Sequence, residues 1–289
     1  MNIPVLIFQQ GYQDYLEVNC KFTSAKNEVI LLGDDSVKHL DKIHNVNFVN
    51  IEKYINNKEI LYYKENFIPF NTTPEKYVWL WYLRVFVMKL FMEDNGLTSI
   101  FHSDSDNILI QNISELNFDF KNGYIINNNK IPTHMTSSIH CGYLSLNFFK
   151  EFTKLYQDLF INKTKFNLIE KKVQFHNIHG KGGICDMTLF YLLHSENIIN
   201  VKNFLQPIKS KLNNEEYFFI DNFADCEGDL GLNQIKLGYN KNVKLYKNKL
   251  NGNLQVFDKI RNKKINILNI HFQGKSKKYL NEKYLKKYL

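Results

Sequence analysis

The first part of the chain alternates between short apolar runs and segments with helical spacing. The apolar runs cover residues 4–8, 28–32 and 46–51, and the helical spacing is found in 12–26 and 36–43 between them. Short apolar runs bounded by polar residues are typical of buried strands. Strands that alternate with helices form parallel sheets covered by helices. The pattern therefore predicts an α/β fold with a mixed, mostly parallel central sheet flanked by helices.

Polar residues and glycines follow the first two predicted strands. Gln9, Gln10 and Gly11 come directly after the first strand, and Asp34 comes just after the second. Ligands of open α/β sheets bind beyond the carboxyl ends of the strands. We therefore expect these four residues to contact a bound nucleotide. The alternative is a plain turn, for which Gly and Asp are common residues.

Two aspartates separated by one residue lie between apolar runs in the stretch 98–110. They are Asp104 and Asp106, with Ser105 between them. Residues i and i+2 of an extended chain face the same side, so the two carboxylates can converge and then repel each other. A divalent cation with a preference for oxygen ligands, Mg²⁺ or Mn²⁺, would relieve that repulsion. The alternative is ordinary turn chemistry, in which Asp and Ser bond their own backbone.

A long apolar segment, residues 77–92, contains Arg84. A helix that is apolar nearly all round is buried, and a buried arginine needs a partner. Because this helix leads directly into the Asp104/Asp106 stretch, we expect Arg84 to point to that loop or to a bound diphosphate. A salt bridge to a structural acid is the alternative.

Asp186 follows a glycine-rich loop, residues 180–183, and precedes a predicted helix. It is either a helix cap, worth about 1 kcal/mol, or a carboxylate presented at the rim of a pocket. The loop lacks the spacing of a phosphate-binding P-loop. Earlier in the chain, Cys141 and Gly142 lie inside a predicted strand, and glycine in a strand often marks the close approach of a ligand or of another backbone.

The last predicted strand, residues 265–270, leads into three residues of different chemistry. His271 offers a metal ligand, Gly274 allows close backbone approach, and Lys277 supplies a cation. A lone histidine after a strand is more often a structural residue than a ligand. The three together are typical of a site for a metal and an anion.

The bulk composition excludes several classes of protein. The chain has 289 residues, 44% of them hydrophobic and 23% charged, as in soluble globular proteins. It has no apolar run of about 18 residues or more, and its start lacks the basic region of a signal peptide. The formal charge of +8 favours anionic ligands, but no nucleic-acid-binding motif accompanies it. We therefore expect a cytoplasmic protein without a nucleic-acid partner.

Residues 278–289 are basic and carry Tyr-Leu pairs. A basic helix with Tyr and Leu can lie on an anionic membrane surface, so peripheral contact with the inner face of a membrane is one prediction. The alternative is a terminal helix that packs its Leu and Tyr side chains onto the protein. We expect one domain, 1–277, followed by this tail.

The motif Asp104-Ser105-Asp106 between two strands, together with His271-x-x-Gly274-x-x-Lys277, resembles the GT-A glycosyltransferases. It is most similar to glycosyltransferase family 8, which includes glycogenin and bacterial galactosyltransferases. The resemblance covers most of residues 1–277 in the order of elements, whereas the match in letters is confined to these motifs. It implies that both aspartates and the histidine bind Mn²⁺ or Mg²⁺. It also implies that the serine lies on the donor side, and that the glycine and the lysine contact the diphosphate of a UDP-sugar.

The same resemblance implies roles for four more residues. Arg84 matches a helix arginine on the donor side of the site. Cys141 and Gly142 fall near the acceptor, and Asp186 falls where the family presents an acid to the sugars. Met187 follows that acid where the family usually has glutamine, so the stereochemical outcome stays open.

These features together predict a metal-dependent hexosyltransferase. Its donor would be a nucleotide diphosphate sugar, and its acceptor a sugar hydroxyl of a glycan or glycolipid, as in surface-polysaccharide synthesis. Asp186 would be the general base of an inverting enzyme, or would orient the sugars in a retaining one. Three alternatives remain: a sugar nucleotidyltransferase, a non-catalytic nucleotide-sugar-binding module, and an Asp-x-Asp phosphatase, whose acid pair would lie at the end of the first strand, where this chain has Gln9 and Gln10. The first normally has a glycine-rich activating loop near its start, which this sequence lacks.

Overall fold

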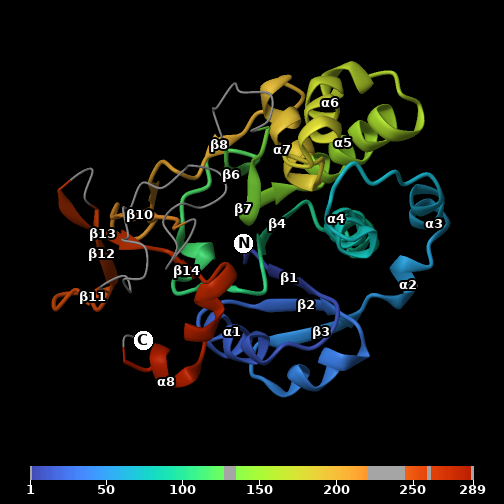
Figure 1. Ribbon diagram of the computed structural model, residues 1–289. Helices are drawn as coiled ribbons and strands as arrows, with labels where there is room; N and C mark the ends of the chain where they lie inside the picture. The colour runs from blue at the N-terminus through green and yellow to red at the C-terminus, as the bar shows by residue number, and fades with distance from the viewer. Residues whose placement is uncertain (1, 127–134, 221–244, 259–261, 288–289) are drawn as a thin grey trace.

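A computed structural model of the chain describes residues 2–126, 135–220, 245–258 and 262–287 (Figure 1). Its largest sheet has seven strands in the order β3-β2-β1-β4-β7-β6-β8. These strands are β1 (Val5–Gln9), β2 (Val29–Gly33), β3 (Val46–Asn50), β4 (Ser99–Ser103), β6 (Gly123–Ile125), β7 (Ser138–Ser145) and β8 (Lys202–Asn203). Neighbouring strands run parallel except at β7, which is antiparallel to both β4 and β6.

Helices cover both faces of this sheet (Figure 1). The α-helices are α1 (Asp14–Ser24), α2 (Glu52–Ile55), α3 (Lys58–Glu65), α4 (Glu75–Asp94), α5 (Leu146–Tyr156), α6 (Glu170–His179), α7 (Asp186–Ser195) and α8 (Glu282–Leu285). Tighter or wider helical turns are η1 (Asp35–Lys42), η2 (Ile113–Glu115), η4 (Gln157–Ile161), η5 (Phe166–Leu168) and η6 (Gly274–Tyr279). The predicted architecture, a mixed and mostly parallel sheet flanked by helices, is confirmed.

Strand β1 explains why the sheet is buried on both faces. Its Leu6 and Phe8 join a core with α4, α5 and α7, whereas Val5 and Ile7 join a second core that includes α1. Successive strand residues point to opposite faces, so one unbroken apolar run supplies both cores. The long apolar helix predicted at 77–92 is α4, and its buried face belongs to the first of these cores.

A second sheet of five strands, in the order β11-β12-β13-β10-β9, was not predicted. Its strands are β9 (Ile208–Lys209), β10 (Glu216–Phe218), β11 (Leu245–Lys247), β12 (Leu254–Asp258) and β13 (Lys263–Ile267). The Asn-Gly-Asn run at 251–253 is typical of a hairpin, and the strands on either side of it, β11 and β12, pair antiparallel. The Gly-Tyr-Asn run at 238–240, which is also typical of a turn, lies outside the described residues.

The prediction of one last strand over residues 265–270 is wrong, because the structure divides this stretch into two strands at Leu268. Strand β13 belongs to the five-stranded sheet, and β14 (Asn269–His271) pairs instead with β5 (Asn107–Leu109). The Asn269 amide donates to the Ile220 carbonyl and its oxygen accepts from the Ile220 backbone amide, so this side chain bonds the backbone where the strand changes partners. The division places His271 next to the Asp104/Asp106 turn.

The tail packs onto the protein over the residues that the structure describes. Leu280 and Leu285 are buried in a third apolar cluster, against which Phe22 of α1 also packs. Lys21 of α1 donates to Glu282 of α8 at 2.9 Å. The last two residues lie outside the described part, and membrane contact stays a prediction.

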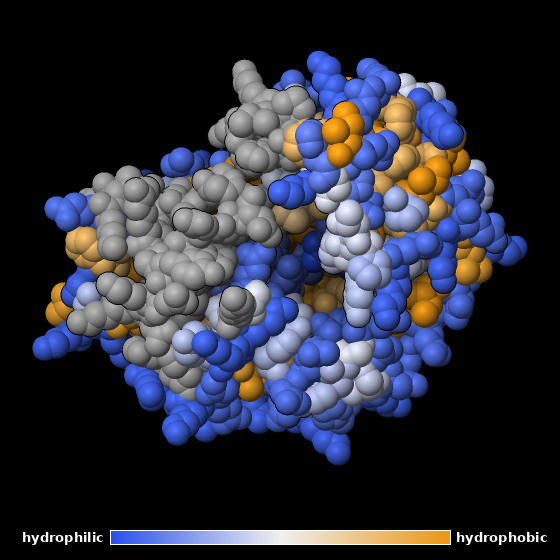
Figure 2. All heavy atoms as spheres, viewed as in Figure 1, coloured by the Kyte–Doolittle hydropathy of each residue, from blue (hydrophilic) through white to orange (hydrophobic). Residues whose placement is uncertain are grey.

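The described surface and helices bear on the membrane prediction in two further ways. On the face shown in Figure 2, hydrophobic residues lie in small groups among hydrophilic ones. None of the helices in the described part of the chain combines the length and the apolar character that crossing a membrane requires.

Candidate active site

Arg84 joins two of the carboxylates singled out in the sequence. Its Nη1 donates to Asp104 Oδ1 and its Nη2 donates to Asp186 Oδ2, each at 2.6 Å. Burial acts to lower the pKa of Arg84, but the two carboxylates outweigh it and raise the pKa above the ordinary value. The guanidinium therefore stays charged and holds together residues from the end of β4 and the start of α7.

The turn that carries the two aspartates is held by another residue. Asn19, buried on α1, donates from its side-chain amide to the carbonyl oxygens of Asp104, Ser105 and Asn107, at 3.3, 2.8 and 3.1 Å. The hydrogen bonds of the Asp104 carboxylate go to Arg84 and His102. Asn19 thus binds the backbone of this turn, while the Asp104 carboxylate points toward Arg84 and His102.

Asp106 is paired with two of the predicted residues, His271 at the end of β14 and Lys277 in η6. His271 Nε2 lies 3.4 Å from Asp106 Oδ1, and Lys277 Nζ lies 3.0 Å from Asp106 Oδ2. The pairing of β14 with β5 sets this arrangement, because it places His271 opposite Asn107. Burial acts to raise the pKa of Asp106, but His271 and Lys277 outweigh it, so that the pKa lies below its usual value.

Two of the three predicted metal ligands fit a divalent cation. Asp106 and His271 present a carboxylate oxygen and an imidazole nitrogen side by side, and both donor types suit Mn²⁺. Asp104 is instead bound to Arg84 and His102. Within the described ranges, no group of three or more His, Cys, Asp or Glu side chains is arranged to hold a metal ion. A metal at this place stays a prediction.

Two buried histidines at the site were missed in the sequence. His102 Nε2 lies 3.0 Å from Asp104 Oδ1, and its Nδ1 lies 3.1 Å from the Leu6 carbonyl. The ring of His140 stacks on that of His271, with centroids 4.2 Å apart. Burial and the neighbouring His271 lower the pKa of His140 to about 3, so this ring is neutral. His102 and His140 each lie in an apolar strand segment, where a single histidine gives little indication of function.

Asp186 is the first residue of α7, and the helix cap is Cys185. The Asp186 Oδ1 accepts from the Met187 backbone amide at 2.8 Å. Burial raises the pKa of Asp186, and Arg84 opposes this rise. Asp186 therefore begins the helix without being its cap, and it also lines a cavity.

The glycine-rich loop before α7 packs tightly on the segment before α4. The Ile184 backbone amide donates to the Phe70 carbonyl at 2.7 Å, and the Asn71 side chain donates to the Ile184 carbonyl at 3.2 Å. A Cβ on Gly183 would lie 2.8 Å from the Phe70 carbonyl oxygen, so only glycine fits there without a shift. Glycine at this position therefore lets the backbone of the loop lie close to the backbone of Phe70.

A cavity of about 460 Å³ collects most of these groups. Its lining residues are Asn71, Trp81, Arg84, Asp104, Asp106, Thr136, Ser138, His140, Cys185, Asp186, Met187, His271 and Gln273. Figure 2 shows the molecule hollowed near the middle of one face, with hydrophilic residues inside the hollow. The cavity thus joins three predicted acids with an arginine, two histidines and one tryptophan.

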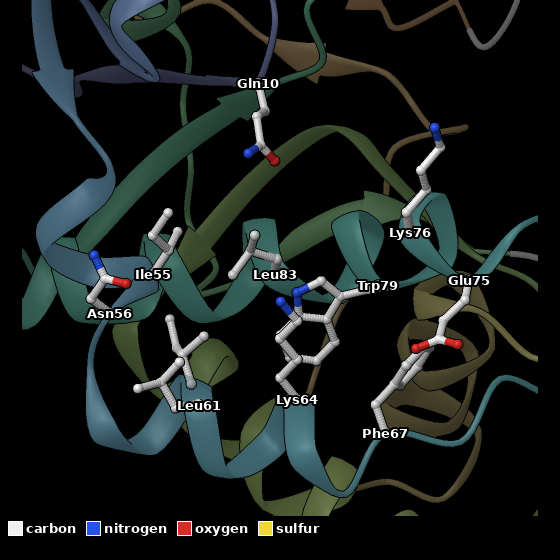
Figure 3. A pocket seen from close by; sticks show the side chains of 11 residues that line it. Gln10, Ile55, Asn56, Leu61, Lys64, Phe67, Glu75, Lys76, Trp79 and Leu83 are labelled. Atoms are coloured by element: carbon white, nitrogen blue, oxygen red, sulfur yellow. The ribbon is translucent and has the colours of Figure 1, made fainter.

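A second cavity of about 550 Å³ lies along the neighbouring side of α4 (Figure 3). Trp79 and Leu83 of α4 face Leu61 and Lys64 of α3 across it, and Gln10 reaches over it from the end of β1. Leu83 lines this cavity and Arg84 lines the first, so α4 contributes side chains to the walls of both cavities. The walls are mainly apolar, with amides and charged groups at the rim.

The predicted loops after β1 and β2 meet each other. The Gly11 backbone amide donates to Asp34 Oδ2 at 2.7 Å, and Ser36 donates to Asp34 Oδ1. Gln9 Nε2 donates to the Gly11 carbonyl at 2.7 Å. Of these loop residues, Gln10 lines the second cavity, whereas Asp34 caps the helical turn η1.

The remaining predicted site residues belong to elements that border the site. Cys141 and Gly142 lie inside β7, and Cys141 Sγ accepts from the Asn107 side-chain amide at 2.9 Å. Gly274 begins η6 with a φ of 57°, in the left-handed region that favours glycine. The contact of these residues with an acceptor or a diphosphate stays a prediction.

Behind the cavity wall, Lys172 of α6 is buried with 1% of its surface exposed. Its Nζ donates to the Met135 carbonyl and to Thr188 Oγ1, both at 2.9 Å. Burial lowers the pKa of Lys172 to about 8. Thr188 lies in the first turn of α7, two residues after Asp186, so Lys172 ties that turn to the segment leading into β7.

No protein-family model matches the chain, and no curated protein matches it. Among solved structures, it is similar to the PaToxG glycosyltransferase, with 10% identity, coverage of 68% of this chain and 70% of that chain, and a TM-score of 0.42. It is also similar to a glycosyltransferase involved in the glycosylation of the major capsid of PBCV-1, with 13% identity, coverage of 62% and 78%, and a TM-score of 0.31.

A third similar structure is the glycosyltransferase GlyE in Streptococcus pneumoniae TIGR4, with 9% identity, coverage of 70% of this chain and 45% of that chain, and a TM-score of 0.32. All three similar structures are glycosyltransferases. With identities and TM-scores this low, they do not assign an activity to this chain. The resemblance to family 8 stays a prediction.

Proposed function

We propose that the chain is a glycosyltransferase that moves a hexose from a nucleotide diphosphate sugar to a sugar hydroxyl. The observation that carries the proposal is the arrangement of three acids around one cavity, each bound to a cation of the chain. Arg84 bridges Asp104 and Asp186, and Lys277 binds Asp106. Such a site can hold a charged leaving group and a hydroxyl nucleophile next to each other.

The leaving group of this reaction is a nucleoside diphosphate, whose negative charge grows as the glycosidic bond breaks. Arg84 and Lys277 are the cations that face the acids of the site, and they supply positive charge for the diphosphate oxygens. Asp106 and His271 would hold Mn²⁺ or Mg²⁺, which would add Lewis-acid stabilisation of the same charge when bound.

The second cavity supports a place for the nucleoside. It lies beyond the carboxyl ends of β1 and β3, where open α/β sheets bind their ligands. Its apolar walls, from Trp79 and Leu83, suit the faces of a base, and the amides of Gln10 and Asn56 at the rim suit its polar edge. Because α4 contributes to the walls of both cavities, we place the nucleoside in the second cavity and the diphosphate and sugar in the first.

Asp186 is the acid that we assign to the acceptor side. It lines the first cavity, and burial raises its pKa, which makes its carboxylate a stronger base. In an inverting reaction it would accept the proton of the acceptor hydroxyl. In a retaining reaction it would orient the sugars, with Arg84 fixing its position in either case.

The test is release of nucleoside diphosphate from a panel of UDP- and GDP-sugars, with and without Mn²⁺ and with mono- and oligosaccharide acceptors. We expect release with at least one donor, and a loss of about 100-fold or more in Asp186→Asn and Asp106→Asn. Asp94→Asn is the matched control, because Asp94 forms an exposed ion pair with Lys53.

Other products would point to the alternatives. Release of pyrophosphate from a nucleoside triphosphate and a sugar phosphate would indicate a sugar nucleotidyltransferase. Binding of nucleotide sugars without turnover for any acceptor would indicate a binding module. Full activity in Asp186→Asn would remove that residue from the chemistry.

A further inference from the structure

Lys277 binds one oxygen of the Asp106 carboxylate, which is a predicted metal ligand. Its Nζ lies 3.0 Å from Asp106 Oδ2, and the Asp106 side chain is only 12% exposed. The other oxygen, Oδ1, faces His271. A cation bound by Asp106 and His271 would therefore share one carboxylate with the Lys277 ammonium, and two cations at one carboxylate repel each other.

Lys277 differs from the other cation of the site in its freedom to move. Arg84 is held by two carboxylates and its side chain is 16% exposed. The Lys277 side chain is 39% exposed and has one carboxylate partner among the described ion pairs. Its ammonium also lies 4.9 Å from the centre of the Tyr15 ring, a favourable cation–π distance. A lysine on a flexible stem at this position can exchange one anion for another.

We propose that Lys277 is the resident counter-ion of Asp106 and competes with a divalent cation for this carboxylate. When a nucleoside diphosphate binds, Lys277 transfers from Asp106 to the diphosphate oxygens, and Asp106 becomes available to the metal. This inference rests on the proposed function, because it takes the diphosphate as the anion that attracts Lys277. It makes nucleotide and metal binding cooperative through one side chain.

The competition predicts opposite effects of one substitution on two ligands. Lys277→Met keeps most of the length of the side chain and removes the charge. Without its competitor, Mn²⁺ alone should bind more tightly, by about fivefold or more, the low end of typical couplings between sites. UDP in the presence of saturating Mn²⁺ should bind more weakly by a similar factor, because the diphosphate loses a cation.

The experiment is calorimetric titration of wild type and Lys277→Met, first with Mn²⁺ alone and then with UDP at saturating Mn²⁺. Lys278→Met is the matched control, because Lys278 is the exposed next residue and its ammonium lies near Tyr279. The control should leave both affinities unchanged. Asp106→Asn should abolish Mn²⁺ binding in both backgrounds, and circular dichroism checks that each variant folds.

Each outcome supports or refutes a defined part of the proposal. Unchanged or weaker Mn²⁺ binding in Lys277→Met refutes the competition, even if UDP binding falls. Absence of Mn²⁺ binding in every variant, with and without UDP, refutes it as well, and leaves a metal-independent transferase open. Tighter Mn²⁺ binding without any nucleotide binding keeps the competition but removes the exchange to a diphosphate. The proposed function fails separately, if no sugar nucleotide is turned over.

Discussion

Lys172 offers a direct test of the buried charge behind the candidate active site. Substitution by methionine keeps most of the side-chain volume and removes the ammonium, with its hydrogen bonds to Met135 and Thr188. Burial disfavours the charged form of Lys172, so that its pKa is about 8 in the folded chain, against 10.5 for an ordinary lysine. Between these two values the unfolded chain binds more protons than the folded one, and stability therefore rises with pH.

The size of this effect follows from the two pKa values. At pH 7 the ammonium is charged in both states, and its burial costs about 3 kcal/mol of folding free energy. As the pH rises to about 9.5, the folded chain loses this proton and recovers about 2 kcal/mol of that cost. The methionine variant lacks this proton altogether. The wild type should therefore gain about 2 kcal/mol relative to Lys172→Met over this range.

Urea unfolding of both proteins between about pH 7 and pH 9.5 measures this difference. Comparison with the variant cancels the titration of all other groups, provided that they keep their surroundings. Lys171→Met is the control, since Lys171 is the preceding, exposed residue, and its difference from wild type should not change with pH. A wild-type-minus-Lys172→Met difference that stays flat over this range would refute the reasoning.

Two further predictions concern stability at other places. Gly183→Ala should lower the free energy of unfolding by about 1–3 kcal/mol, because its Cβ would lie 2.8 Å from the Phe70 carbonyl oxygen; an unchanged urea midpoint would contradict this. Leu285→Ala should cost about 2–4 kcal/mol, since this side chain is fully buried, whereas Leu250→Ala, 96% exposed, should cost almost nothing. Equal midpoints for the two leucine variants would show that the tail does not pack as described.

Much of the central sheet could be predicted because its signals are local. The apolar runs of β1 and β2 are long enough to show in the sequence, and the helices between them follow from spacing. The second sheet could not be predicted, since strands such as β9 and β10 have only two or three residues. Runs that short do not show the alternation of apolar and polar residues that identifies a strand.

The residues of the candidate site could be predicted from the sequence, but most of the contacts between them could not. The sequence indicated Arg84, the two aspartates and Asp186, but not that Arg84 binds Asp104 and Asp186 together. Such a pairing depends on how α4, β4 and α7 are placed in space. His140 was missed for the same reason, because its significance comes from stacking on His271, which is distant in the sequence.

The division of the last strand at Leu268 has a consequence for the order of synthesis. A ribosome makes Asp106 long before it makes His271 and Lys277, because His271 lies 165 residues further along the chain. Until β14 has formed beside β5, the Asp106 carboxylate lacks the two partners that it has in the finished protein. Strands β1 to β4 can therefore form on the nascent chain, whereas the counter-ions of this acid are synthesised about 165 residues after it.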